Sequence, residues 1–334
     1  MKAMTVAAPG GLDRLRLEER PEPGDPGPGE IRVALHGSSL NYHDYGVVTG
    51  GMPTDDRRVP MADGGGTVEA VGDGVREFAV GDSVVSCFFP DWLAGPPEVG
   101  DFSRTPGDGI DGFAQERVVL PATAFTRAPR GYDAVEAATI TTAGLTAWRA
   151  LVVDGNLKAG DTVLLLGTGG VSIWALQIAK AMGARVAITS SSDEKLERAR
   201  TLGADFTLNY RSEAEWGRRV RDWSGVGVDH VVEVGGPGTL AQSIEAVRVG
   251  GHISLIGVLT GRGGEVPTAA LMAKQARLQG LIVGSRADQQ AFVTALEATG
   301  IRPVVDRRFA LEGLADAFRY EESGSHFGKI GVEW

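Results

Sequence analysis

Cysteine is almost absent from this chain: Cys87 is the single one among 334 residues. One thiol cannot form an intramolecular disulfide, and it cannot build a zinc cage that needs several cysteines. Cys87 lies in the apolar run VVSCFF, without an adjacent histidine or basic run, so we expect a buried strand residue rather than a nucleophile.

Long apolar runs are missing as well. No stretch approaches about 18 uninterrupted apolar residues, so the sequence predicts no membrane span. The first residues, MKAMTVAAPGGLDRL, lack the apolar core of a secretory signal. We therefore expect a cytoplasmic protein.

Positive charge is scarce too, because the net charge is −10. This balance argues against a protein that binds nucleic acid or anionic membrane by bulk electrostatics. Glycine is abundant instead, with 48 residues, about twice the usual share of ~7%. Many turns and close backbone approaches are therefore expected, and a small molecule is the expected partner.

Strand and helix patterns divide the chain into two styles. Up to about residue 125, short strand-like runs alternate with Gly/Pro turns, which predicts a β-rich domain. After Pro129, strands and helices alternate, which predicts a doubly wound parallel α/β sheet. The pattern is mixed again beyond about Lys274. We therefore expect a β-rich domain of residues 1–127 and 275–334, with an α/β domain, 128–274, inserted into it.

The expected elements of the β-rich part are strands over 30–39, 66–72, 82–89 and 115–120, with a late strand over 278–283, a helix over 289–299 and a last strand over 329–332. The expected elements of the α/β part are a helix over 133–154, strands over 162–167, 185–190, 206–210, 228–235 and 252–258, and helices over 171–182, 194–202, 213–223 and 239–247.

A glycine-rich turn, LLLGTGGV, separates the first α/β strand from a long helix and places Gly167, Gly169 and Gly170 together. In a βαβ unit such glycines form the tight turn and let a pyrophosphate approach the helix N-terminus. Ser172 stands where a third glycine is usual, and it is small enough to keep the packing. The alternative is a glycine turn of an unrelated α/β protein. The strand–turn–helix–strand context favours a dinucleotide site.

The end of the next strand indicates which dinucleotide binds. An NAD site usually has an acid there, about 20 residues beyond the glycines, whereas this chain has Thr189-Ser190-Ser191-Ser192 and then Lys195. Hydroxyls and a nearby ammonium suit a 2′-phosphate, which favours NADP(H). The serines also fit the start of a helix, since Ser191-Ser-Asp-Glu194 reads as a capping box. The two interpretations are compatible.

Further motifs are spread over the whole chain: NYHD at 41–44, PMADGGGTVEAVG at 60–72, VGDSV at 80–84, GFA at 112–114, TAGLTA at 142–147, GAD at 203–205, VDHVVE at 228–233 and HFGK at 326–329. With the glycine turn, they resemble the medium-chain dehydrogenase/reductase superfamily, and most closely its zinc-independent branch of NADPH:quinone oxidoreductases and enoyl reductases. This resemblance implies a GroES-like domain plus a Rossmann domain. It also implies a homodimer or homotetramer, often joined through the last Rossmann strand, here about 251–259.

Zinc-dependent members of that superfamily hold their catalytic metal with a Cys, a His-Glu pair and a later Cys or Asp. By resemblance, the Cys position is Asn41 and the His-Glu pair is Ala62-Asp63, and the four-cysteine lobe is absent. A catalytic zinc commonly has three protein ligands, so one carboxylate does not suffice. The five histidines show no HExxH or other paired spacing. We expect no catalytic metal.

A metal-free site favours hydride transfer to a quinone or to the C=C bond of an α,β-unsaturated carbonyl. The developing negative charge then needs a hydrogen-bond donor and a proton. The resemblance places Asn41 at the nicotinamide, Tyr42 or Tyr45 as candidate proton donors, and Asp44 in a structural or cofactor-orienting role. His43 could donate the proton too, although a surface histidine is the simpler interpretation. A zinc-free alcohol/carbonyl oxidoreductase and a non-catalytic NADPH-binding protein are the alternatives.

The resemblance also extends the cofactor site to residues outside the glycine turn. Arg286 and Lys329 could equally be exposed cations. A loop over 88–110 carries Phe89, Trp92 and Phe102 and could line the substrate pocket or pack on a partner subunit; we favour the pocket. The complete candidate set for the cofactor is Asn41, Thr142, Thr146, Gly167, Thr168, Gly169, Gly170, Val171, Ser190, Ser191, Lys195, Tyr210, Gly235, Val258, Gly284, Ser285, Arg286, Phe327, Gly328 and Lys329, with Gly236 beside Gly235.

Overall fold

The computed structural model describes all residues, 1–334, and the chain forms two compact units. Unit 1 comprises residues 1–145 and 283–334, and unit 2 comprises residues 146–282. These boundaries differ from the expected ones at 127/128 and 274/275. Helix α2 (Ala134–Ala138) packs on the sheet of unit 1, and strand β13 (Arg277–Gly280) pairs with the sheet of unit 2.

Unit 2 is built on a six-stranded parallel sheet in the order β10-β9-β8-β11-β12-β13. In chain order this is 3-2-1-4-5-6, the order of a dinucleotide-binding Rossmann sheet. The predicted doubly wound class is confirmed. The strands are β8 (Thr162–Leu166), β9 (Arg185–Ser190), β10 (Phe206–Asn209), β11 (Val228–Glu233), β12 (Val247–Leu255) and β13, and the helices are α4 (Gly170–Ala181), α5 (Asp193–Thr201), α6 (Trp216–Ser224), α7 (Leu240–Ala246) and α8 (Thr268–Lys274).

The outer edge of this sheet differs from the expectation. Residues 251–259 were expected to form the last strand, but β12 is flanked by β13, so that β13 is the edge. The run expected as a strand over 278–283 therefore belongs to unit 2, not to the β-rich unit. The amino-acid composition of this run would suit a strand of either sheet. Its pairing with His252–Leu255 of β12 places it in the sheet of unit 2.

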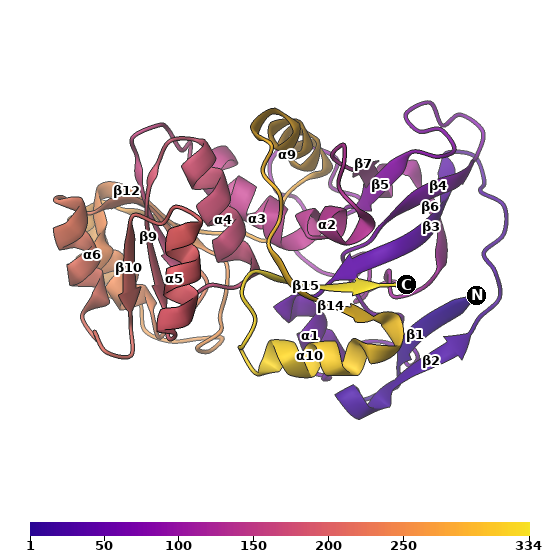
Figure 1. Ribbon diagram of the computed structural model, residues 1–334, viewed down its shortest axis with the longest axis horizontal. Helices are drawn as coiled ribbons and strands as arrows, with labels where there is room; N and C mark the ends of the chain where they lie inside the picture. The colour runs from indigo at the N-terminus through magenta and orange to yellow at the C-terminus, as the bar shows by residue number, and fades with distance from the viewer. The chain divides into compact units, whose positions relative to one another are not determined.

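Unit 1 contains a seven-stranded sheet along the path β14-β15-β3-β4-β5-β7, with β6 paired to β3, and a separate β1-β2 hairpin. Strand β15 is antiparallel to β3, so the two ends of the chain meet in one sheet; Figure 1 shows yellow β14 and β15 beside indigo β3. The strands are β1 (Lys2–Val6), β2 (Leu15–Glu19), β3 (Glu30–Ser39), β4 (Gly65–Val71), β5 (Ser83–Ser86), β6 (Arg117–Pro121), β7 (Phe125–Arg127), β14 (Val305–Ala310) and β15 (Lys329–Glu333).

The helices of unit 1 are α1 (Tyr42–Val48), α2, α9 (Arg286–Thr299) and α10 (Leu314–Glu322), with short 3-10 turns η1 (Leu12–Arg14), η2 (Ala122–Ala124) and η5 (Leu311–Gly313). The sequence interpretation missed α1, α8 and α10 and strands β1, β2, β7 and β14. Short elements carry little periodicity, and tertiary packing stabilises them. One of these is α10, which packs with β1 in a core that includes Met4, Leu314 and Phe318.

The segment expected as one helix over 133–154 is helical but irregular. After α2 it passes through a π-helical turn η3 (Ile140–Gly144), a short α3 (Leu145–Trp148) and a second π-helical turn η4 (Arg149–Val153). Single π turns inside helices are frequent at functional sites. Here the first π turn carries Thr142.

The aromatic loop after β5 packs inside unit 1. Phe89 and Trp92 are 4% and 5% exposed, and Phe89 stacks on Phe102 with ring centroids 6.3 Å apart. The carbonyls of Trp92 and Leu93 accept hydrogen bonds of 2.9 Å from the first backbone N–H groups of α9. Phe89 and Trp92 are therefore core residues of unit 1, and Phe102 is half-buried beside them, while a role of the loop in lining the substrate pocket stays a prediction. No helix of the protein is both long and apolar enough to cross a membrane.

Candidate active site

The glycine turn of unit 2 leaves the start of α4 open. Gly167 has φ +72°, and a side chain added there would meet nothing within 4 Å. The N-cap, Gly169, has no side-chain cap, so free backbone N–H groups and the helix dipole face outward there. Ser172 donates from Oγ to the carbonyl of Leu166 at 2.6 Å, which ties helix to strand where a glycine is usual. The turn therefore fits a pyrophosphate.

Ser190 and Tyr210 are neighbours at the carboxyl ends of β9 and β10, and Lys195 lies in the first turn of the next helix, α5. Ser190 ends β9 and is 3% exposed, and its carbonyl accepts from the backbone N–H of Tyr210 at 3.1 Å. Ser192, not Ser191, caps α5 and accepts from the N–H of Lys195 at 3.4 Å. The expected capping box is therefore wrong by one residue, since its third position is a lysine. Capping by Ser192 leaves Ser190 and Ser191 as candidates for a phosphate.

Arg211 follows Tyr210 directly, and sequence reasoning missed it. Its side chain is exposed, while its backbone N–H donates to Asn209 Oδ1 at 3.0 Å. It adds a second cation near Ser190, because the preceding strand β10 pairs with β9 at Ser190. A single arginine after a short strand has no sequence pattern that marks it as a binding residue. The pairing of β10 with β9 shows that it follows a strand beside Ser190.

The backbone N–H groups of Gly235 and Gly236 are already engaged. Both donate to Glu233 Oε1, at 2.8 and 3.0 Å, and Thr239 Oγ1 donates to the same oxygen at 2.6 Å. Ser243 Oγ donates to the other carboxylate oxygen. Glu233 thereby fixes the turn after β11. A nucleotide bound there would make van der Waals contacts with Gly235 and Gly236, because their N–H groups already donate to Glu233.

In unit 1, the NYHD motif forms the start of α1. Asn41 is the N-cap, and the Asp44 carboxylate accepts from the backbone N–H of Asn41 at 3.0 Å, forming a capping box. The amide nitrogen of Asn41 also donates to Asp44 Oδ2 at 3.1 Å. The other Asp44 oxygen accepts from the N–H of Ala62 at 2.9 Å. Asp44 therefore joins α1 to the segment before β4, which supports its predicted structural role.

A buried ammonium occupies the centre of this group. Lys329, 3% exposed, donates from Nζ to Asn41 Oδ1 at 2.6 Å and to the carbonyl of Leu40, and it lies 3.6 Å from Asp63 Oδ2. Asp63, 0% exposed, accepts from Ser39 Oγ at 2.5 Å and from Thr142 Oγ1 at 2.6 Å. The exposed-cation alternative for Lys329 is therefore wrong. We call Asn41, Asp44, Asp63, Thr142 and Lys329 the lysine cluster.

Burial changes the acidity of two carboxyl groups near Lys329. Burial, then repulsion from Asp63, raises the pKa of Asp44 to about 7, against the opposing effect of its hydrogen bonds and of Lys329. Burial also raises the pKa of Glu321 to about 8, and Glu321 Oε2 is buried without a hydrogen-bond partner. Sequence reasoning did not single out Glu321, because the run Glu321-Glu322-Ser323 resembles an ordinary solvent-exposed segment.

The raised pKa values of Asp44 and Glu321 predict how the free energy of unfolding depends on pH. Because the folded chain holds protons on Asp44 and Glu321 that the unfolded chain loses near pH 4, the free energy of unfolding falls as pH rises towards 8. His43 and His252, whose pKa burial lowers to about 4, act oppositely below about 6.5. The net fall is therefore expected between about pH 6.5 and 8, from both carboxyls up to about pH 7 and mainly from Glu321 above it, by up to about 1.4 kcal/mol per pH unit for each group.

Urea denaturation at several pH values measures this dependence. Glu321→Gln should flatten the slope above pH 6.5, whereas Glu312→Gln, a change of an exposed glutamate, should leave it unaltered. An identical slope in Glu321→Gln and wild type would contradict the assignment.

The two tyrosines differ in their surroundings. Tyr42 is 60% exposed and stacks on Tyr45 with centroids 5.7 Å apart. Tyr45 donates its hydroxyl proton to Glu322 Oε1 at 2.8 Å, and this hydrogen bond raises the pKa of Tyr45 to about 12. Tyr45 is therefore committed to Glu322, whereas the Tyr42 hydroxyl stays open to solvent.

The run Gly284-Ser285-Arg286 starts helix α9. Ser285 is its N-cap and forms a capping box with Asp288. Arg286 donates to the carbonyl of Phe125 at 2.9 Å and to Glu77 at 2.6 Å, and its side chain is 11% exposed. The exposed-cation alternative is wrong for Arg286 too. These contacts give Ser285 and Arg286 structural partners, and a cofactor role for them stays a prediction.

The rest of the candidate set lies as follows. Thr146 and Thr168 are buried in unit 2, Val171 is in the first turn of α4, and Val258 is 48% exposed after β12. Phe327 is 1% exposed in unit 1, and Gly328 has φ +79°, where a side chain would meet the carbonyl of Val304 at 2.6 Å. Phe327 therefore packs in the core. The tight turn at Gly328 leads the chain into strand β15.

The residues at the metal-ligand positions do not fit a zinc ion. Asn41 Oδ1 accepts from an ammonium, and both oxygens of Asp63 accept from hydroxyls. No group of three or more His, Cys, Asp or Glu side chains is placed to hold a metal. The cation beside Asp63 is Lys329, whose Nζ lies 3.6 Å from Asp63 Oδ2.

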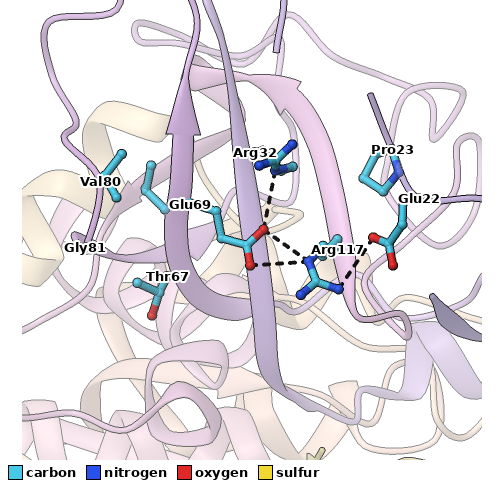
Figure 2. Close-up of a pocket in the computed structure, with 9 residues that line it drawn as sticks. Glu22, Pro23, Arg32, Thr67, Glu69, Val80, Gly81 and Arg117 are labelled. Atoms are coloured by element: carbon cyan, nitrogen blue, oxygen red, sulfur yellow. Dashed lines mark hydrogen bonds and ion pairs between the residues drawn. The ribbon is translucent and has the colours of Figure 1, made fainter. Parts of the chain in front are cut away.

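Unit 1 also has a hollow of about 630 Å³ on its sheet, shown in Figure 2. Glu69 lies between two arginines there: Arg117 Nε donates to it at 3.1 Å, and Arg32 Nε lies 3.4 Å away. Arg117 also pairs with Glu22 at 3.4 Å. Its charges are neutralised internally, so this hollow offers no free group for catalysis.

Comparisons with known proteins agree with this geometry. Residues 27–130 match the family described as Alcohol dehydrogenase GroES-like domain, and residues 170–298 match Zinc-binding dehydrogenase. A zinc-type alcohol dehydrogenase-like protein, C1773.06c of Schizosaccharomyces pombe, is 41% identical over 330 residues, which cover 96% of this chain and 95% of that protein. An acryloyl-coenzyme A reductase of Sulfurisphaera tokodaii is 26% identical over 344 residues, with full coverage of both.

Solved structures give the same result. An alcohol-dehydrogenase-type protein of Sinorhizobium meliloti 1021 superposes with a TM-score of 0.93 at 42% identity, covering 100% of this chain and 99% of that one. A structure described as an NAD-dependent alcohol dehydrogenase has a TM-score of 0.90 at 35% identity, with full coverage of both chains. The chain belongs to the medium-chain dehydrogenase/reductase superfamily of oxidoreductases, with a GroES-like domain and a Rossmann-like parallel sheet.

Proposed function

We propose that this chain is an NADPH-dependent, metal-free oxidoreductase that reduces a quinone or the C=C bond of an α,β-unsaturated carbonyl. The lysine cluster is the observation that carries the proposal. At the positions where zinc-dependent relatives hold their metal, Lys329 Nζ donates to Asn41 Oδ1 at 2.6 Å and lies 3.6 Å from Asp63. A site without a Lewis acid suits an acceptor that needs little carbonyl polarisation.

The lysine cluster would contribute positioning rather than bond-making. Asn41 is held from both ends, by Lys329 at its oxygen and by Asp44 at its nitrogen, so the orientation of its amide is fixed. A bound reduced nicotinamide supplies the hydride. Residues that hold their geometry before reaction lower the reorganisation cost of the charge that develops on the substrate oxygen.

The preference for NADPH rests on the end of β9. No carboxylate stands at Ser190 to accept from a ribose 2′-hydroxyl. Ser191, Lys195 and Arg211 instead bring a hydroxyl and two cations to the segments that follow β9 and β10. Phosphate recognition favours such donors and positive charges. The free N–H groups at the start of α4 would bind the pyrophosphate.

A second candidate is the oxidation and reduction of a C–OH/C=O pair. The similarity to the alcohol dehydrogenase-like protein of S. pombe and to the structure described as an NAD-dependent alcohol dehydrogenase supports it. That reaction needs stronger stabilisation of an alkoxide, and here it would depend on hydrogen-bond donors alone.

Coenzyme consumption measured at 340 nm tests both candidates. We expect purified protein to oxidise NADPH in the presence of a quinone or an enone, more slowly with an aldehyde, and several-fold less efficiently with NADH. Dialysis against a chelator should leave the rate unchanged, since Asn41 and Asp63 already accept hydrogen bonds from Lys329 and from two hydroxyls.

Three outcomes would contradict the proposal. Better turnover with NADH would refute the coenzyme assignment, and loss of activity with the chelator would refute the metal-free assignment. Fluorescence-detected NADPH binding without turnover of any acceptor would identify a non-catalytic NADPH-binding protein.

A further inference from the structure

His43 is enclosed in a way that its sequence context does not reveal. It lies in the first turn of α1, and its ring packs against Phe102 and Phe88, with centroids 4.8 and 5.3 Å apart. Its side chain is 15% exposed, yet Nε2 is buried. The buried nitrogen is therefore Nε2, and the exposed part of the side chain lies elsewhere.

Asp108 faces the buried nitrogen. Its Oδ2 lies 3.5 Å from His43 Nε2, and the residue is 8% exposed. Backbone bonds fix its position: its N–H donates to the carbonyl of Thr105 at 3.2 Å, and its carbonyl accepts from Thr54 Oγ1 at 3.0 Å. Sequence reasoning missed Asp108, because PGDG is ordinary turn composition.

Burial of His43 beside Asp108 costs folding free energy, and a structural role alone does not explain it. Buried polar atoms are nearly always hydrogen-bonded, but His43 Nε2 and the Oγ1 of fully buried Thr105, in the same turn as Asp108, have no hydrogen-bond partner. A carboxylate beside one imidazole nitrogen orients a proton-transferring histidine, whose other nitrogen then serves the substrate. Asp108 stands in the place of that carboxylate.

We propose that His43 exchanges the proton with the substrate oxygen, and that Asp108 is its positioning residue. This inference rests on the proposed oxidoreductase function and names the proton donor that such a reaction requires. It replaces Tyr45, whose hydroxyl is engaged by Glu322, and it differs from the Tyr42 alternative.

The proton balance is as follows. In reduction, the hydride that a bound coenzyme would supply forms a C–H bond in an enone or a carbonyl compound, which leaves an enolate or an alkoxide, or an O–H bond in a quinone, which leaves a phenolate. The imidazolium N–H of His43 then breaks as the O–H bond forms, and the neutral imidazole regains a proton from solvent. Burial lowers the pKa of His43 to about 4, so the ring is mostly neutral at pH 7. The Asp108 carboxylate stabilises the transient imidazolium.

Substitution of His43 tests the proposal in the full-length protein. General acid–base groups contribute about 10²–10⁴-fold, so His43→Gln and His43→Ala should each lower kcat about a hundredfold or more. NADPH binding, followed by fluorescence, should be unaltered. Added imidazole should restore part of the activity of His43→Ala, because it fills the vacated space. His36→Gln, a change of an exposed histidine in β3, is the matched control and should resemble wild type.

Asp108→Asn tests the positioning role by two readouts. Asp108 is the ionisable group in contact with His43, and Arg58 acts on Asp108 in turn. Without the carboxylate, the imidazolium is less stable, so NMR titration should show a lower pKa for His43 than in wild type. The high-pH decline of kcat in the reduction should move to lower pH by the same amount, while KM for NADPH stays constant.

The results separate the inference from the function on which it rests. Wild-type kcat in His43→Gln, loss without rescue by imidazole in folded His43→Ala, or an unshifted titration in Asp108→Asn would each overturn the inference alone. Absence of turnover by the wild-type protein with every acceptor would overturn the proposed function and this inference together.

Discussion

Ser190→Asp is expected to reverse the coenzyme preference. Ser190 is the last residue of β9, where NAD sites place an acid that accepts from the ribose hydroxyls. A carboxylate there would face the 2′-phosphate of NADPH, and like charges in contact cost several kcal/mol. Since about 1.4 kcal/mol is tenfold in affinity, the Kd for NADPH should rise about a hundredfold or more, while the Kd for NADH stays similar or falls.

Ser190→Asn is the matched control, because it adds similar volume without charge and should weaken both coenzymes only slightly. Arg211→Met should weaken NADPH alone, about tenfold, since it removes one cation. Fluorescence titration with both coenzymes gives the four constants. Equal weakening of NADPH and NADH by Ser190→Asp would show that the end of β9 does not recognise the 2′-phosphate.

Lys329→Met is expected to destabilise the protein strongly. The ammonium is 3% exposed beside a fully buried Asp63, and removal of one partner of a buried ion pair costs about 3–5 kcal/mol. Lys329 also lowers the pKa of both Asp44 and Glu321. The destabilisation should therefore grow with pH, as these carboxyls ionise without a cation beside them.

Urea denaturation monitored by tryptophan fluorescence measures this loss. Lys158→Met, a change of an exposed lysine, should stay within about 0.5 kcal/mol of wild type. The double change Lys329→Met with Asp63→Asn should recover part of the loss, because it removes both charges. A Lys329→Met protein as stable as the wild type at pH 8 would contradict the assignment of a buried ion pair.

The sequence predicted those parts of the fold that have a strong local period. The apolar strand Thr162–Leu166, the glycine turn and the alternating strands and helices up to Leu255 lie within a few residues of their expected bounds. Buried parallel strands and the long helices between them leave a clear pattern. Elements with few residues, such as α1 and β14, leave none, and their packing within unit 1 decides them.

The candidate site divides in the same way. The glycine turn and the serines of β9 were recognisable because backbone conformation and local charge fix their chemistry within a few consecutive residues. The partnership of Lys329 with Asn41 and Asp63 joins residues from three distant segments, so no local pattern contains it. The same holds for Asp108 behind His43 and for Glu233 behind Gly235.

By itself, the sequence determined the α/β class, the place of the glycine turn and the absence of a cysteine-based zinc site. Local periodicity and residue identity are sufficient for these. The tertiary structure decided which charges are buried, which hydroxyls are already engaged and which nitrogen of His43 is enclosed. These depend on desolvation and on contacts between remote segments, and only the folded chain brings such groups together.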